Sequence, residues 1–183
     1  AEDASRTNIE DLITFAKEND VRVIIIAGDM FDKKHIPLKI RKKVFDYIKD
    51  CPNIDFLYIK GNHDDCDVDG NDKPENLILF SNTWSNYTYE DVVIHGINFS
   101  KNTNTYLYET LMTDANKINI VTLHGQVVNH SSEENINLNN LKNKGIDYLA
   151  LGHIHQYQVG TLDSRGVYCY CGCLESRGFD ETG

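Results

Sequence analysis

The chain has 183 residues, 40% hydrophobic and 25% charged, a composition typical of one globular domain with its own core. No apolar run approaches the roughly 20 residues of a membrane-spanning helix, which argues against a membrane protein. The net charge of −10 argues against simple nucleic-acid binding through a surplus of Lys and Arg.

The first part of the chain predicts the order helix, strand, helix, strand. Thr7 and Glu10 have the spacing of a capping box, and apolar residues then recur at helical intervals. Residues 21–27 are nearly continuous valine and isoleucine, which is typical of a central strand buried on both faces. Pro37 suits the first turn of a second helix, and residues 54–59 form the next apolar run. This order predicts a βαβ unit.

Beyond residue 64 the chain predicts shorter elements. Asp65, Asp67 and Asp69 alternate as in a calcium loop, but the closing glutamate is missing, so a flexible loop is favoured over a calcium site. Strands are expected at residues 77–80, 87–89, 92–97, 118–123, 148–151 and 167–170. Helices are expected near residues 106–113 and 137–143.

The five cysteines are an odd number without regular spacing and do not form the pattern of a disulfide framework. Cys169, Cys171 and Cys173 alternate and would point to one face of a strand. A soft-metal or redox site is one interpretation, but without a CxxC pair we favour buried cysteines that act as small hydrophobic residues. We therefore expect a cytoplasmic protein.

Four apolar runs each end in a short cluster that contains residues able to bind a metal. The clusters are Gly28-Asp29-Met30-Phe31-Asp32, Gly61-Asn62-His63-Asp64, Leu123-His124-Gly125 and Gly152-His153-Ile154-His155. Because ligands collect outside the carboxyl ends of strands in open α/β sheets, we expect one site at one sheet edge. Carboxylate, amide and imidazole groups suit a pair of divalent first-row metals, and the lack of thiolates argues against a structural zinc site.

The order and spelling of these clusters resemble the calcineurin-like metallophosphoesterase superfamily, whose blocks read GDxxD, GNHD, a histidine at a strand end, and GHxH. Residues 18–32 and the run Cys171-Gly172-Cys173-Leu174-Glu175 are most similar to the bacterial DNA-repair exonucleases of the SbcD type. The resemblance implies an α/β fold, a four-layer α/β/β/α sandwich that forms a single domain over residues 1–183. It also implies a metal-dependent phosphoesterase.

The resemblance assigns the metal ligands. Asp29 would bridge two metals, Asn62, His124 and His153 would complete the second metal's set, and His155 would bind the first metal. Two metals roughly 3.5–4 Å apart can share a hydroxide and hold the attacking and leaving oxygens of a displacement at phosphorus. Manganese is the favoured ion, with iron and zinc as alternatives.

The remaining motif residues are assigned roles around the metals. His63 resembles the family's non-ligand histidine, which stabilises the transition state or protonates the leaving oxygen. Asp64 would support it through backbone and outer contacts, and Asp32 would orient a ligand or the substrate. His35, His95 and His130 fall outside the motifs, and we expect no role for them in the site.

One departure concerns the Asp-x-His triplet that opens the superfamily's first strand, because no such triplet precedes Gly28. We interpret the chain as truncated at both ends and lacking that strand. The second metal should then bind firmly and the first weakly, with poor hydrolysis of phosphodiesters. The exposed edge beside residues 21–27 should favour aggregation.

Three functions remain open. The first is a DNA exo/endonuclease subunit that cleaves phosphodiester bonds, for which the resemblance implies an SbcC-type ATPase subunit as partner. A homodimer also fits, with no membrane. The second is a stand-alone phosphodiesterase or phosphatase on a small substrate, which the acidic charge favours. The third is a non-catalytic scaffold, against which the intact metal-ligand residues argue.

The basic residues near the first metal motif have two interpretations. They are a solvated helix face, or a patch that steers a phosphodiester backbone toward the site. The residues are Lys33, Lys34, Lys39, Arg41, Lys42 and Lys43.

Overall fold

The structure, a computed structural model, describes residues 2–31, 37–64, 68, 70–100, 105–129 and 135–174, with backbone alone for 2–8 and 105–106. Some predictions therefore lie outside the described residues. They are the role of Asp32, the loop that contains Asp65, Asp67 and Asp69, and the expectations for Lys33, Lys34, His35 and His130.

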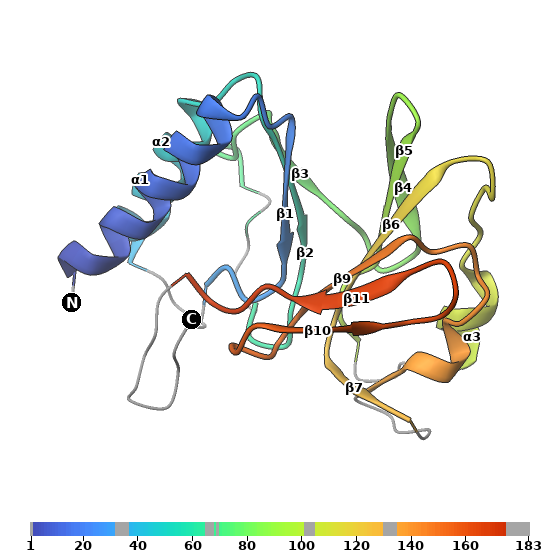
Figure 1. The fold of residues 1–183 in the computed structure, drawn as a ribbon. Coiled ribbons are helices and arrows are strands. Elements are labelled where there is room, and N and C mark those ends of the chain that lie inside the picture. Colours follow the sequence, from blue (N-terminus) through green and yellow to red (C-terminus); the bar gives the residue numbers. More distant parts are fainter. Residues whose placement is uncertain are drawn as a thin grey trace.

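The first two layers are a pair of helices and a parallel sheet (Figure 1). The helices are α1 (Glu2–Glu18) and α2 (Leu38–Lys49), and the strands are β1 (Val23–Ala27), β2 (Asp55–Ile59) and β3 (Leu77–Leu79). Strand β2 lies between β1 and β3 and is parallel to both. The predicted capping box is wrong, because α1 begins at Glu2, five residues before Thr7. The preceding Glu, Ala and Arg residues favour helix, so the helix extends through them.

The third layer is a mixed sheet with the strand order β10-β11-β9-β6-β5-β4. Its strands are β4 (Ser85–Tyr89), β5 (Val92–Gly96), β6 (Ile118–His124), β9 (Tyr148–Gly152), β10 (Gln158–Thr161) and β11 (Val167–Tyr170). The pairs β4–β5 and β10–β11 are antiparallel, and the central pairs are parallel. The fourth layer holds α3 (Thr105–Thr110) and the 3-10 helix η1 (Leu138–Asn140), with a small sheet of β7 (Gln126–Val128) and β8 (Asn135–Asn137).

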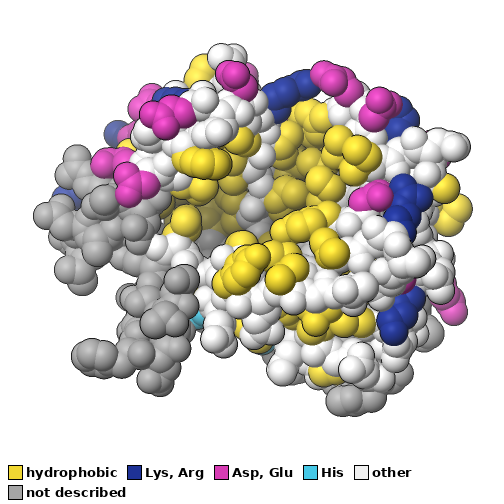
Figure 2. All heavy atoms as spheres, in the orientation of Figure 1, with side chains coloured by type: hydrophobic (Ala, Val, Ile, Leu, Met, Phe, Trp, Pro, Cys, Tyr) yellow, Lys and Arg dark blue, Asp and Glu magenta, His cyan; other side chains and the backbone are white. Residues whose placement is uncertain are grey.

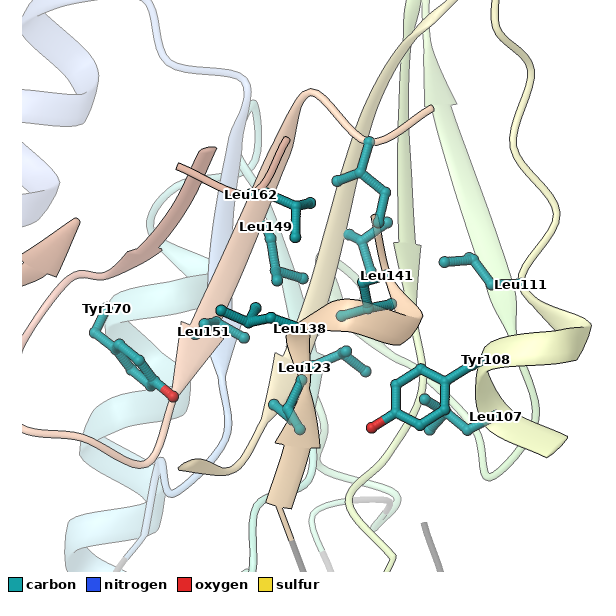
Figure 3. Close-up of a cluster of buried hydrophobic side chains, with 13 residues drawn as sticks. Leu107, Tyr108, Leu111, Leu123, Leu138, Leu141, Leu149, Leu151, Leu162 and Tyr170 are labelled. Carbon is teal, nitrogen blue, oxygen red and sulfur yellow. The ribbon is translucent and has the colours of Figure 1, made fainter. Parts of the chain in front are cut away.

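Three clusters of buried side chains join these layers. One packs α1 and α2 onto the first sheet through residues such as Ala16, Phe45 and Ile48. A second lies between the two sheets and includes Leu57 and Ile94. The third gathers side chains from α3, β6, β9 and η1, as Figure 3 shows. The predicted four-layer α/β/β/α arrangement is confirmed.

Strand β1 differs from its predicted environment. Residues 21–27 were expected to form a central strand buried on both faces, but β1 lies at the edge of its sheet and every residue is partly exposed. The predicted burial is wrong for the described chain, whereas the edge position agrees with the exposed edge expected beside residues 21–27, because no described strand pairs with the outer edge of β1. On the face drawn in Figure 2, hydrophobic side chains gather in a hollow between the helical layer and the second sheet. The expected aggregation stays a prediction.

The cysteines at the end of β11 only partly follow the predicted burial. Cys169 is buried, but Cys171 is exposed and Cys173 is intermediate, because β11 ends at Tyr170 before the alternation can continue. All four described cysteines are free thiols. In the part of the chain that the structure describes, no helix combines the length and apolar character needed to cross a membrane.

His95 lies in β5 and forms part of a buried polar network. The amide nitrogen of Asn119 donates to the carbonyls of Asp114 and Gly145, so its Oδ1 is the acceptor for His95 Nε2 at 3.1 Å. The ring therefore carries its proton on Nε2. Burial lowers the pKa of His95, since the neutral ring is favoured inside the sheet.

We expect this network to make the protein less stable in acid. Below about pH 6.5, His95 binds a proton more readily in the unfolded chain than in the folded chain, where its pKa is lowered. The unfolding free energy therefore falls as the pH falls through that range. His95→Gln keeps a donor toward Asn119 and removes the titration. Urea unfolding between pH 7 and pH 5 should show a flatter pH dependence for this variant. Equal pH dependence in parent and variant would exclude His95 as the cause.

Candidate metal centre

The predicted site residues lie where four strands end. Asp29 and Asn62 follow the parallel strands β1 and β2, His124 is the last residue of β6, and His153 follows β9. In the second sheet His124 pairs in register with Gly152. A side chain at Gly152 would place its Cβ 1.7 Å from the Ala27 carbonyl oxygen, so only glycine lets the ends of β1 and β9 meet. The two sheets therefore bring their carboxyl ends together at one place.

Four of the five predicted metal ligands are close neighbours. The ligand atoms of Asp29, His124 and His153 all lie within 4.8 Å of one another. The Asn62 Oδ1 atom lies 2.7 Å from His124 Nε2 and 3.3 Å from His153 Nδ1, and Asp29 Oδ2 lies 3.3 Å from His124 Nε2. His155 is outside the group of three, although its charge contributes to lowering the pKa of His153. The ligand role of each residue stays a prediction.

The chemistry of this group fits a cation. His124 Nδ1 is 2.8 Å from the Ala27 carbonyl oxygen and donates its proton there, so Nε2 is the ring nitrogen that faces the other site residues. It lies 2.7 Å from Asn62 Oδ1 and 3.3 Å from Asp29 Oδ2, so three atoms able to bind a cation converge. A divalent ion would take the place of a proton on Nε2, and the hydrogen bond to Ala27 would orient the ring for it.

Two pKa shifts favour the protonation states that bind metals. Burial raises the pKa of Asp29, but the hydrogen bond and charge of His124 and the His63 backbone N–H outweigh it, and the pKa is lowered overall. The pKa of His153 is lowered by burial first and then by the charge of His124. Asp29 is thus ionised and His153 neutral at pH 7, as coordination requires.

Two of these side chains belong to residues with a strained backbone conformation. Asp29 has φ of 53° and His153 has φ of 96°, both in the left-handed region that disfavours side chains. Such conformations cost on the order of 1–3 kcal/mol each and are concentrated at functional sites. Gly61 adds a close approach, because a Cβ there would lie 2.3 Å from Asp29 Oδ1 and displace the carboxylate. The glycine of the GN pair thus leaves room for the Asp29 carboxylate.

His63 and Asp64 are differently placed. His63 is exposed, its backbone N–H donates to Asp29 Oδ1 at 3.0 Å, and its charge acts on both Asp29 and His153. Asp64 is buried, and its carboxylate accepts the backbone N–H groups of Asp29 at 2.5 Å, Gly61 at 2.7 Å and Phe31 at 3.3 Å. Asp64 therefore ties the loop after β1 to the loop after β2.

We expect Asp64→Asn to weaken both the fold and the metal centre. An amide would direct an N–H donor at backbone N–H donors, and one such unsatisfied group costs about 1–3 kcal/mol. Asp163 is a matched control, because it also accepts three backbone N–H groups, in the turn between β10 and β11. Urea unfolding should show a loss for both variants, whereas manganese affinity should fall only for Asp64→Asn. An equal fall in both would make Asp64 a purely structural residue.

The sequence gives no signal for one neighbour of the metal centre. The Phe99 ring packs edge-on against His124, with ring centroids 5.8 Å apart and planes at 82°. Its backbone N–H donates to the Lys60 carbonyl at 2.8 Å, which fixes it beside the loop after β2. Phe99 belongs to no motif, and it reaches the site because it follows β5, which pairs with β6, and because it bonds to Lys60.

Comparisons with known proteins agree with this geometry. Residues 3–157 match the family described as Calcineurin-like phosphoesterase. The chain is 28% identical over 193 residues to the uncharacterized metallophosphoesterase YhaO of Bacillus subtilis (strain 168), covering 96% of this chain and 47% of that protein. It is 30% identical over 177 residues to the DNA double-strand break repair protein Mre11 of Saccharolobus solfataricus, covering 88% and 46%. The chain thus spans about half the length of these curated relatives.

A solved structure supports the fold alone. The crystal structure of TT1561 of Thermus thermophilus superposes with a TM-score of 0.65 at 10% sequence identity, and covers 93% of this chain and 85% of that chain. The strand-end cluster, the layered fold and the sequence match over most of the chain lead to one conclusion. The chain belongs to the calcineurin-like phosphoesterase family.

Proposed function

We propose that the chain carries the catalytic centre of a two-metal, manganese-dependent DNA exo/endonuclease of the SbcD type. The observation that carries the proposal is the convergence of the side chains of Asp29, Asn62, His124 and His153, whose ligand atoms lie close together. The similarity to an Mre11 protein named for DNA double-strand break repair supports DNA as the substrate. Iron or zinc could take the place of manganese at such donors.

Each residue would contribute a defined part. Asn62, His124 and His153 would hold one ion with Asp29, and His155 would bind the other ion together with Asp29, which both ions would share. The bound ions would supply Lewis-acid charge that activates water and offsets negative charge at the phosphate. His63, which is exposed beside Asp29, would protonate the leaving oxygen or stabilise the transition state. Phe99 packs against one side of His124 and limits the positions that its ring can adopt.

We also propose a partner subunit, an assembly state and a location for the protein. A nuclease subunit of the SbcD type would work with an SbcC-type ATPase subunit and act as a homodimer. The free thiols among the described residues agree with a cytoplasmic location. DNA repair would be the process served.

A second candidate is a phosphodiesterase or phosphatase on a small substrate, which the net charge of −10 favours. A non-catalytic scaffold has less support. It would gain nothing from the strained backbone at Asp29 and His153 that holds the metal-ligand atoms together.

The test is hydrolysis with manganese under single-turnover conditions, which detects slow cleavage. The substrates are end-labelled single- and double-stranded DNA, the diester bis(p-nitrophenyl) phosphate and the monoester p-nitrophenyl phosphate, each with an EDTA control. We expect metal-dependent cleavage of DNA and of the diester. Hydrolysis of the monoester alone would favour a phosphatase, and bound metal without hydrolysis of any substrate would favour the scaffold.

A further inference from the structure

The first half of α2 presents three exposed lysines on one side. Lys39, Lys42 and Lys43 are spaced by three and four residues, so their side chains are neighbours on the helix surface. Arg41 is used differently. It forms an ion pair with Asp72 and lies 5.1 Å from the Phe45 ring centroid. The three lysines are therefore the part of the basic run that is open to a partner.

These charges are not used in ion pairs among the described residues. Within the described part of the chain, none of the three lysines has an ion-pair partner, and the first turn of α2 contains no acidic residue. Asp46 follows one turn later on the same side without pairing to them. Cations in the first turn of a helix oppose the helix dipole, and Lys39 lies in the first turn of α2. The three lysines are exposed in a chain whose net charge is −10.

The three lysines lie toward the same end of the first sheet as the metal centre. Strands β1 and β2 are parallel, and α2 connects them, so α2 runs back along the sheet (Figure 1). Its first turns therefore lie toward the end of the sheet where Asp29 and Asn62 follow their strands. Only the first half of α2 carries the cluster, since its second half contains Asp46 beside Lys49, and Asp50 follows as the C-cap.

We propose that Lys39, Lys42 and Lys43 form a docking surface for the sugar-phosphate backbone of a nucleic acid whose scissile bond lies at the metal centre. This surface rests on the proposed nuclease function and names how the substrate strand is held. Each lysine would neutralise one phosphate and release condensed counterions. For a single strand this contributes about 0.7 to the slope of log K against log salt per contact, and three contacts contribute about 2.

The test is fluorescence anisotropy of a labelled single-stranded oligonucleotide in EDTA over a range of salt concentrations. The variant is Lys39→Gln/Lys42→Gln/Lys43→Gln, and the control is Lys17→Gln/Lys49→Gln/Lys142→Gln, which removes the same charge from exposed lysines elsewhere. We expect the variant to bind at least about tenfold more weakly at low salt, with a slope smaller by about 2. The control should stay close to the parent.

Two further measurements separate docking from structure and chemistry. Thermal unfolding should show the variant at least as stable as the parent, because the substitutions remove no ion pair and Lys39→Gln relieves an unfavourable interaction with the helix dipole. Hydrolysis of bis(p-nitrophenyl) phosphate should be unchanged, since a small diester does not reach the lysines. Oligonucleotide binding without cleavage would leave the surface in place and count against the proposed nuclease function.

Three outcomes would overturn the docking surface. The first is an equal loss of binding in variant and control, which would reduce the effect to net charge. The second is unchanged oligonucleotide binding with lost binding to phosphatidylserine–phosphatidylcholine vesicles, which would indicate a lipid surface. The third is unchanged oligonucleotide binding with altered sedimentation, which would indicate a protein interface.

Discussion

Replacing Asp29 with asparagine is expected to abolish metal-dependent hydrolysis while leaving the fold intact. The substitution removes the negative charge that would be shared by the metals, and the Lewis-acid contribution that it supports is worth several kcal/mol. A fall of about 10³-fold or more in kcat/KM follows from that loss. Asparagine is nearly isosteric and is among the residues best tolerated at the φ of 53° found here. Circular dichroism and thermal unfolding should therefore be close to those of the parent.

A matched control for this variant exists in the same chain. Asp20 is exposed and has φ of 51°, so Asp20→Asn makes the same chemical change in the same backbone conformation. It should keep full activity. If Asp29→Asn retained activity close to that of Asp20→Asn, Asp29 would not be the bridging ligand.

Replacing His63 with alanine should lower the catalytic rate by roughly 10²–10⁴ with little change in metal content, as expected for a general acid outside the coordination shell. The side chain is exposed, so the fold should not suffer. Single-turnover cleavage and elemental analysis of bound manganese measure the two effects separately. The loss should be larger for DNA than for bis(p-nitrophenyl) phosphate, because nitrophenolate leaves without needing a proton.

His153→Ala is the comparison for this experiment. Its imidazole lies in the close group with Asp29 and His124, and its loss should lower metal content. Loss of bound metal in His63→Ala to the same degree would make His63 a ligand. An equal rate loss for both substrates would favour transition-state stabilisation over proton donation.

The strands that carry the site could be predicted from the sequence because their apolar runs are long and end in polar clusters. The run before Asp29 gives β1, and the runs before Asn62 and His124 give β2 and β6. Parallel pairing then places their ends at one edge. The four-layer arrangement follows from the resemblance that these clusters carry.

Other features depend on tertiary contacts, which a local sequence pattern cannot predict. Continuous valine and isoleucine in β1 cannot show whether a neighbouring strand covers it, and β1 is an edge strand among the described residues. Strand β10 is short and largely exposed, with the sequence Gln-Val-Gly-Thr, so neither periodicity nor hydrophobicity marks it. The orientation of the His124 ring depends on the Ala27 backbone carbonyl, and Phe99 reaches His124 through the position of β5 and a hydrogen bond to Lys60.

Diffraction at the manganese absorption edge from crystals grown with manganese would locate a bound ion. We expect an anomalous peak among Asp29, Asn62, His124 and His153, on the Nε2 side of the His124 ring, with His124 Nδ1 still bonded to the Ala27 carbonyl. A peak on His124 Nδ1, or manganese bound only away from these residues, would contradict the proposed metal centre.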